Sequence, residues 1–178
     1  MKFNKIILTG DSAGGFLTVS TTVLAILNNV RIPDGIMPVY PAIGTNLGDF
    51  VPSSLCALDD WVLSSGFLSY CMSSFIAYKV NSSTNFLVNL SLTPDAVLLK
   101  FPRCHIYVCE ADPLRDHAII FGLRLHKLNK DVKINFMQDY IHGFLSLDLK
   151  INGVEEYHHS VGHATETLRH LMGGGIRK

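Results

Sequence analysis

Three residues of this sequence have the types that nucleophilic attack on a carbonyl carbon requires. Ser12 lies within Gly10-Asp11-Ser12-Ala13-Gly14, and Asp112 and His142 follow it along the chain in that order. A serine hydroxyl becomes a strong nucleophile when a histidine takes its proton, and a carboxylate stabilises the histidine in the working tautomer and in its cationic form. Such a set cleaves an ester through an acyl-enzyme, which water then releases. The three residues therefore predict a serine hydrolase, provided that the fold brings them together.

The segment around Ser12 predicts a buried strand, a sharp turn and the start of a helix. Ile6-Ile7-Leu8 is an apolar run without polar alternation, as expected of a parallel strand covered on both faces. The glycines of the G-x-S-x-G pattern, followed by Gly15, supply the small residues that such a turn needs. We expect the Ala13 N–H, at the helix N-terminus, to stabilise an oxyanion. A phosphate-binding loop is the competing interpretation, but no lysine follows the glycines as that motif requires.

The acid and the base each follow another predicted strand. Asp112 comes shortly after the apolar segment 105–109, and His142 follows the alternating segment 133–137, whose pattern favours a sheet edge. Because the carboxyl ends of parallel strands meet at one edge of the sheet, Ser12, Asp112 and His142 are expected there together.

Other acids and histidines compete for these two roles. Glu110 should still point along its strand, and Asp116 is better suited to cap the next helix. His142 alone precedes a glycine in a loop after a strand. The other histidines fall in a predicted strand or on predicted helices: His105, His117, His126, His158, His159, His163 and His170.

The rest of the chain supplies helices and one further strand. The aromatic-rich region 59–80 has helical character, which we interpret mainly as core packing, with a minority of its residues lining an acyl pocket or a lid. We predict a helix over 16–28 that is buried all round, a strand over 35–41, a loop over 42–53, helices over 118–128 and 154–172, and a glycine-rich tail over 173–175. This order predicts an α/β fold with parallel strands, flanking helices and right-handed crossovers.

Composition limits the class of protein. The 178 residues are 48% hydrophobic, enough for one domain with a sizeable core. Lys+Arg and Asp+Glu each number 15, so nothing favours nucleic-acid binding. The four cysteines have no metal-ligand spacing and are interpreted as small core residues of a reduced cytoplasmic protein without metal or cofactor. Neither a signal peptide nor a transmembrane segment is predicted.

Motifs at all three positions resemble those of one family. Gly10-Asp11-Ser12-Ala13-Gly14-Gly15, the segment Asp112 to Asp116 and His142-Gly143-Phe144 resemble the motifs of the hormone-sensitive lipase family of α/β-hydrolases. Segments 52–55, 62–63 and 92–95 resemble its eukaryotic members more than bacterial esterases. The resemblance implies hydrolysis of carboxylic esters, with acylglycerols or sterol esters as lipid substrates. It also implies that Ser12 is the nucleophile, Asp112 the acid and His142 the base.

One departure from the family pattern is large. The family carries a His-Gly-Gly-Gly segment upstream of the serine turn that completes the oxyanion hole, and this sequence has none. We therefore expect residues 1–178 to form a single truncated α/β-hydrolase catalytic domain that lacks the N-terminal strands of the fold. The apolar strand at residues 5–9 would then be an uncovered edge, and we predict that it is a site of aggregation or of partner binding. Association with a lipid surface, and an impaired half-domain that acts only as a partner-dependent or non-enzymatic fragment, are the open alternatives.

Overall fold

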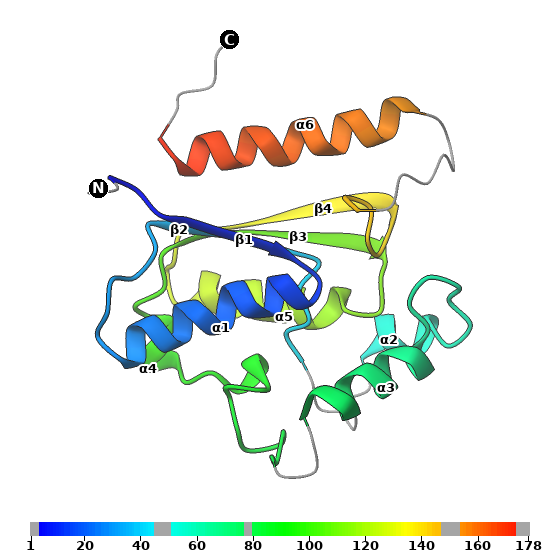
Figure 1. The fold of residues 1–178 in the computed structure, drawn as a ribbon, viewed down its shortest axis with the longest axis horizontal. Helices are drawn as coiled ribbons and strands as arrows, with labels where there is room; N and C mark the ends of the chain where they lie inside the picture. Colours follow the sequence, from blue (N-terminus) through cyan, green and yellow to red (C-terminus); the bar gives the residue numbers. More distant parts are fainter. Residues whose placement is uncertain (1–3, 45–50, 77–79, 147–153, 174–178) are drawn as a thin grey trace.

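The computed structural model describes residues 4–44, 51–76, 80–146 and 154–173, of which 154–160 are described by their backbone. Its centre is a sheet of four parallel strands in the order β1-β2-β3-β4, namely β1 (Ile7–Asp11), β2 (Gly35–Val39), β3 (Arg103–Ala111) and β4 (Val132–Ile141). Helices α1 (Ala13–Leu27) and α5 (Arg115–Lys127) cover one face, and α6 (Val154–Leu171) covers the other (Figure 1). The predicted α/β order with parallel strands is confirmed.

The two inner strands explain why helices must cover both faces. Every residue of β2 is buried, as are the residues from Cys104 to Cys109 in β3. Alternate side chains enter two separate cores, one with α1 and α5 and one with α6. Ile36 and Ile106 belong to the first core, and Met37 and Tyr107 belong to the second.

The two outer strands differ in how they are exposed. β4 lies at one end of the sheet, as its polar and apolar alternation predicts, with Phe136 exposed and Met137 buried. β1 lies at the other end, and no strand of the described residues pairs with its outer edge. Beside that edge, Ile6, Leu8 and Leu24 help to line an apolar groove of about 460 Å³.

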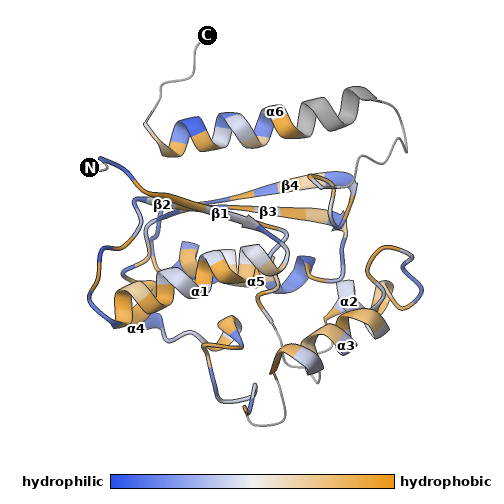
Figure 2. Cartoon of the chain, in the orientation of Figure 1, coloured by the Kyte–Doolittle hydropathy of each residue, from blue (hydrophilic) through white to orange (hydrophobic). Residues whose placement is uncertain are grey.

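The expectations for the apolar helices need correction. Helix α1 is not buried all round, because Leu17, Leu24 and Leu27 are exposed. The region 59–80 is helical only in α3 (Ser65–Ile76), with residues 77–79 outside the described part of the chain, and Met72 is the buried residue of α3. Core packing is therefore the wrong interpretation for its exposed aromatic residues, among them Trp61, Phe67, Tyr70 and Phe75. Figure 2 shows how hydrophobic residues run along α1 and α3.

Smaller elements lie between β2 and β3, outside the sheet. They are the helices α2 (Pro52–Cys56) and α4 (Asp95–Leu98) and the 3-10 turn η1 (Leu90–Leu92). Helix α5 begins at Arg115 with Leu114 as its N-cap, so the predicted capping role of Asp116 is wrong. Cys104 and Cys109 are buried as expected, whereas Cys56 and Cys71 are exposed. None of the helices in the described segments is long and apolar enough to span a bilayer. The end of the predicted tail, residues 174–175, lies outside those segments.

Candidate active site

Ser12 occupies a sharp turn between β1 and α1. Its φ of 54° and ψ of −114° are a strained combination for a residue with a side chain. A Cβ atom on Gly10 would lie 2.5 Å from the Gly14 carbonyl oxygen, and one on Gly15 would lie 2.7 Å from Cβ of Pro41. The turn therefore requires glycine at positions 10 and 15, whereas a Cβ on Gly14 has room, its nearest contact being 3.8 Å away.

Asp112 follows β3 directly and is buried. Its Oδ1 accepts the Leu114 N–H at 2.8 Å, and its backbone carbonyl accepts the Arg115 N–H at 3.1 Å. These bonds leave Oδ2 free to face the ring of His142, which lies 2.8 Å away at Nδ1. The loop after β3 thus holds the carboxylate through contacts of its own, in addition to the contact with the histidine.

His142 follows β4 and joins the other two residues. Its Nδ1 lies 2.8 Å from Asp112 Oδ2 and its Nε2 lies 2.9 Å from Ser12 Oγ. Because an ionised carboxylate only accepts hydrogen bonds, Nδ1–H donates to Asp112 and Nε2 is left to accept the serine hydroxyl. The structure therefore brings together the three residues that the sequence selected. The tautomer with a proton on Nδ1 is the one that a general base requires.

Ala13 is the first residue of α1 and is exposed. A backbone N–H in the first turn of a helix has no partner within the helix, and the helix dipole favours negative charge there. The Ala13 N–H is thus available to an oxyanion formed at Ser12. Among the described residues, no group of three or more His, Cys, Asp or Glu side chains could hold a metal ion.

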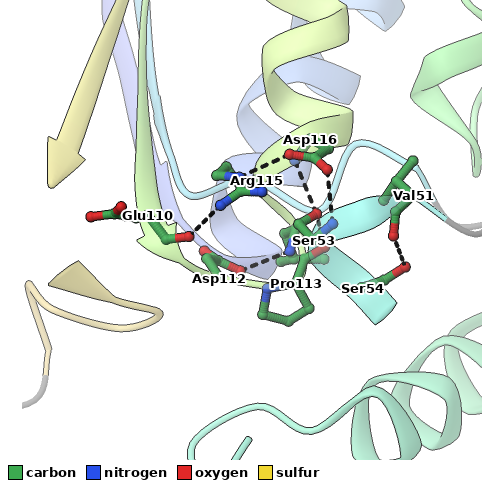
Figure 3. Close-up of polar contacts among 9 residues, drawn as sticks. Val51, Ser53, Ser54, Glu110, Asp112, Pro113, Arg115 and Asp116 are labelled. Carbon is green, nitrogen blue, oxygen red and sulfur yellow. Dashed lines mark hydrogen bonds and ion pairs between the residues drawn. The ribbon is translucent and has the colours of Figure 1, made fainter. Parts of the chain in front are cut away.

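A polar network ties the loop of Asp112 to α2 (Figure 3). The Ser53 N–H donates to Asp116 Oδ2 at 2.8 Å, and the Ser53 hydroxyl donates to the Pro113 carbonyl at 3.0 Å. Arg115 donates through Nε to Asp116 Oδ1 at 2.8 Å and through Nη1 to the Glu110 carbonyl at 2.7 Å. Burial opposes ionisation of Asp116, but the bonds from Arg115 and Ser53 outweigh it and hold the pKa of that carboxyl below its usual value. Asp116 therefore joins α5 to α2 and takes no part in the contact with His142.

Sequence reasoning missed two residues of this site. Ser53 is buried and contacts the acid loop across 60 residues of chain, and its only sequence signal was a family-like segment. Tyr40 is buried with its ring centroid 4.8 Å from that of His142, and its signal was its place at the end of a predicted strand.

Comparisons with known proteins agree with this architecture. The profile of a family described as having the alpha/beta hydrolase fold matches residues 1–146. An esterase of Gibberella moniliformis is 26% identical over 139 residues, which are 78% of this chain and 43% of that protein. The hormone-sensitive lipase of Homo sapiens is 42% identical over 82 residues, 46% of this chain and 7% of that protein.

Solved structures give the same result. Carboxyl esterase 2 of the fungus Tuber melanosporum superposes with a TM-score of 0.75 at 26% identity, covering 89% of this chain and 52% of that one. An esterase of Pyrobaculum calidifontis superposes with a TM-score of 0.80 at 19% identity, covering 93% and 52%. The chain thus spans about half the length of these solved esterases and less than half of the curated relatives.

Proposed function

This chain belongs to the alpha/beta hydrolase fold family, and we propose that it is a serine hydrolase that cleaves carboxylic esters with Ser12, His142 and Asp112. The observation that carries the proposal is the hydrogen bonding of His142 at both ring nitrogens, to Asp112 at 2.8 Å and to Ser12 at 2.9 Å. The similarity to esterases and hormone-sensitive lipases supports the same reaction class.

In the proposed mechanism His142 Nε2 takes the Ser12 proton as Oγ attacks the ester carbonyl. Asp112 stabilises the imidazolium that forms, and the Ala13 N–H stabilises the oxyanion. The imidazolium then gives its proton to the leaving alcohol, which leaves Ser12 acylated. A water molecule, deprotonated by His142, attacks the acyl carbonyl, and the proton returns to Ser12 Oγ as the acid departs.

We infer that lipid esters such as acylglycerols or sterol esters are the substrate class. Support comes from the similarity to hormone-sensitive lipases. Exposed apolar side chains of the α2 and α3 region, including Leu58, Trp61 and Tyr70, favour association with a lipid surface. Cytoplasmic location stays a prediction.

A second candidate function is a half-domain that acts only with a partner. Two observations favour it: β1 has an outer edge that no described strand pairs with, and the groove beside it is apolar. In this case the chain would not activate Ser12 without its partner.

Labelling with a fluorophosphonate tests the proposal, because such a probe reports an activated serine even when turnover is slow. We expect one adduct, located on Ser12 by mass spectrometry and absent from Ser12→Ala. His142→Ala and Asp112→Asn should slow labelling by about 100- to 10,000-fold. Ser20→Ala is the matched control, because Ser20 is a buried serine of α1 whose hydroxyl bonds to the Leu17 carbonyl.

Two outcomes separate the candidate functions. Ser12 labelling together with hydrolysis of p-nitrophenyl esters, with longer acyl chains preferred, would support a lipid esterase. If the chain is folded and the probe labels neither Ser12 nor any other serine, the proposal that this chain hydrolyses esters by itself is overturned. That result would favour the partner-dependent fragment.

A further inference from the structure

Tyr40 lies beneath the loop that carries His142. It is the first residue after β2, is 1% exposed, and donates its N–H to the Tyr107 carbonyl at 2.8 Å. Its φ of 33° is in the left-handed region, which a bulky side chain rarely adopts. Strained backbone of this kind persists where the surroundings enforce it, and it clusters at functional sites.

The ring of Tyr40 contacts residues on both sides of Gly143. Its centroid is 4.8 Å from the His142 imidazole with an interplanar angle of 59°, and 5.4 Å from the Phe144 ring with an angle of 72°. Gly143 has a φ of 86° and permits the chain to reverse between these two contacts. Phe144 also packs on Tyr140 of β4, at 5.1 Å. One aromatic side chain thus contacts both the imidazole and the residue two positions later.

The hydroxyl of Tyr40 reaches the far end of the same loop. It lies 3.4 Å from Asp11 Oδ2, and the Ser146 hydroxyl donates to the same oxygen at 3.1 Å. Burial and the Asp11 carboxylate raise the pKa of the Tyr40 hydroxyl. The Ser146 side chain and the Leu145 backbone also face this hydroxyl and offset part of the rise. Asp11 immediately precedes Ser12, so this contact connects the loop of the base to the turn of the nucleophile.

We propose that Tyr40 is a positioning residue for His142: its ring and hydroxyl hold the loop 142–146 so that Nε2 faces Ser12 Oγ. The inference rests on the proposed function, because it assigns Tyr40 a role in that reaction. The side chain of Tyr40 contacts His142, Phe144 and Asp11, so it acts through the histidine.

The test compares variants of Tyr40 with variants of a second buried tyrosine. Tyr107 belongs to the same core beneath α6, and its hydroxyl bonds to His163 Nδ1 at 2.8 Å and to Thr167 Oγ1 at 2.7 Å. Tyr40→Leu and Tyr40→Met remove the ring, Tyr40→Phe keeps it, and Tyr107→Leu and Tyr107→Phe are the controls. Methionine is included because its unbranched, flexible side chain adapts to an irregular gap, which keeps the test usable if the leucine variant does not fold.

The first measurement is the rate of Ser12 labelling by the fluorophosphonate at saturating probe. Displacement of a reacting group by about 1 Å can cost 100-fold, so the ring-free Tyr40 variants should lose about 10- to 100-fold in this rate at an unchanged half-saturating probe concentration. Tyr40→Phe keeps the ring and loses only the hydroxyl contact to Asp11, so it should lose less of the rate than the ring-free variants. The Tyr107 variants should label like the parent chain. Equal labelling of folded Tyr40→Met and Tyr107→Leu would overturn the inference.

The second measurement does not depend on activity. The Nδ1 proton of His142, held by Asp112, gives a low-field NMR signal that His142→Gln removes and thereby assigns. We expect this signal to broaden and to exchange faster in the ring-free Tyr40 variants but not in the Tyr107 controls. An unchanged signal in Tyr40→Met would refute the positioning role. If the parent chain shows the signal but no labelling, the proposed function fails while the role of Tyr40 in orienting the imidazole is still decided.

Discussion

The serine turn allows a stability prediction in which two adjacent glycines should respond with opposite signs. Gly14 and Gly15 are both in the first turn of α1 and neither has a positive φ. A Cβ on Gly14 would meet only Asp11 Oδ1, at 3.8 Å. A Cβ on Gly15 would lie 2.7 Å from Cβ and 2.9 Å from Cα of Pro41, and 3.1 Å from the Val39 carbonyl oxygen. The helix context is shared, so the two alanine variants differ mainly in this collision.

The magnitude follows from the contact distances. Carbon atoms pack at about 3.5–4.0 Å, so Gly15→Ala requires Pro41 and α1 to separate by roughly 1 Å, and overpacking of this kind costs about 1–3 kcal/mol. Alanine in a helix gains up to about 1 kcal/mol over glycine at either position. Gly14→Ala should therefore raise the free energy of unfolding by about 0.5–1 kcal/mol. The free energy of unfolding of Gly15→Ala should be about 1–3 kcal/mol lower than that of Gly14→Ala, because both variants share the helix gain and only Gly15→Ala collides with Pro41.

Urea denaturation, followed by circular dichroism, measures this difference directly. The midpoints should separate while the slope m stays constant, since neither change alters the area exposed on unfolding. Equal midpoints, or a Gly15→Ala variant more stable than Gly14→Ala, would refute the argument that close packing against Pro41 fixes glycine at position 15.

Three further predictions concern contacts around the site and in the core. Ser53→Ala removes the buried bond to the Pro113 carbonyl and should lower the free energy of unfolding by about 1–3 kcal/mol; Ser54→Ala, half-buried, is the control, and equal losses would contradict the network. Burial and, after it, the nearby charges of His170 and Lys133 lower the pKa of His105 from 6.5 to about 4. Between these two pH values His105 therefore takes up a proton only in the unfolded chain. Stability should then fall by on the order of 3 kcal/mol as pH drops through that window. His105→Phe should flatten this slope in pH-dependent urea titrations, and an unchanged slope would refute the assignment. Thiol reagents should modify two cysteines of the folded chain rapidly and two only after unfolding, and fast modification of all four would contradict the burial; the exposed pair is Cys56 and Cys71 and the buried pair is Cys104 and Cys109.

Local pattern was sufficient to select the three residues of the candidate site. Each of them directly follows a strand, and strand pattern is readable because buried parallel strands are continuous apolar runs. The common edge of parallel strands then implies proximity, and the structure shows hydrogen-bond contact among Ser12, His142 and Asp112. The α/β class with parallel strands followed from the order of the elements. The resemblance of the motifs narrowed it to the α/β-hydrolase fold, and the family match agrees with that.

Burial of helix faces could not be predicted in the same way. An apolar stripe on a helix indicates a face that favours burial, but it does not show whether other residues of the protein pack against that face. Thus Leu24 of α1 and Phe67 of α3 are apolar yet exposed. Ser53 and Tyr40 were missed for a related reason, because their partners lie far along the chain and no local spacing reveals them.

The alignment of the site depends on strand register as well as on loop conformation. The Ser12 N–H donates to the Val39 carbonyl at 2.9 Å, and the next residue, Tyr40, donates its N–H to Tyr107 at 2.8 Å. Each strand end is thereby fixed to its neighbour, from β1 through β2 to β3. The Asp139 N–H, which donates to a carboxylate oxygen of Glu110 at 2.8 Å, continues the connection to β4. A slip of one residue would turn the buried side chains of a strand to its other face, so the core that fixes the register also holds Ser12 and His142, 130 residues apart, within hydrogen-bond distance.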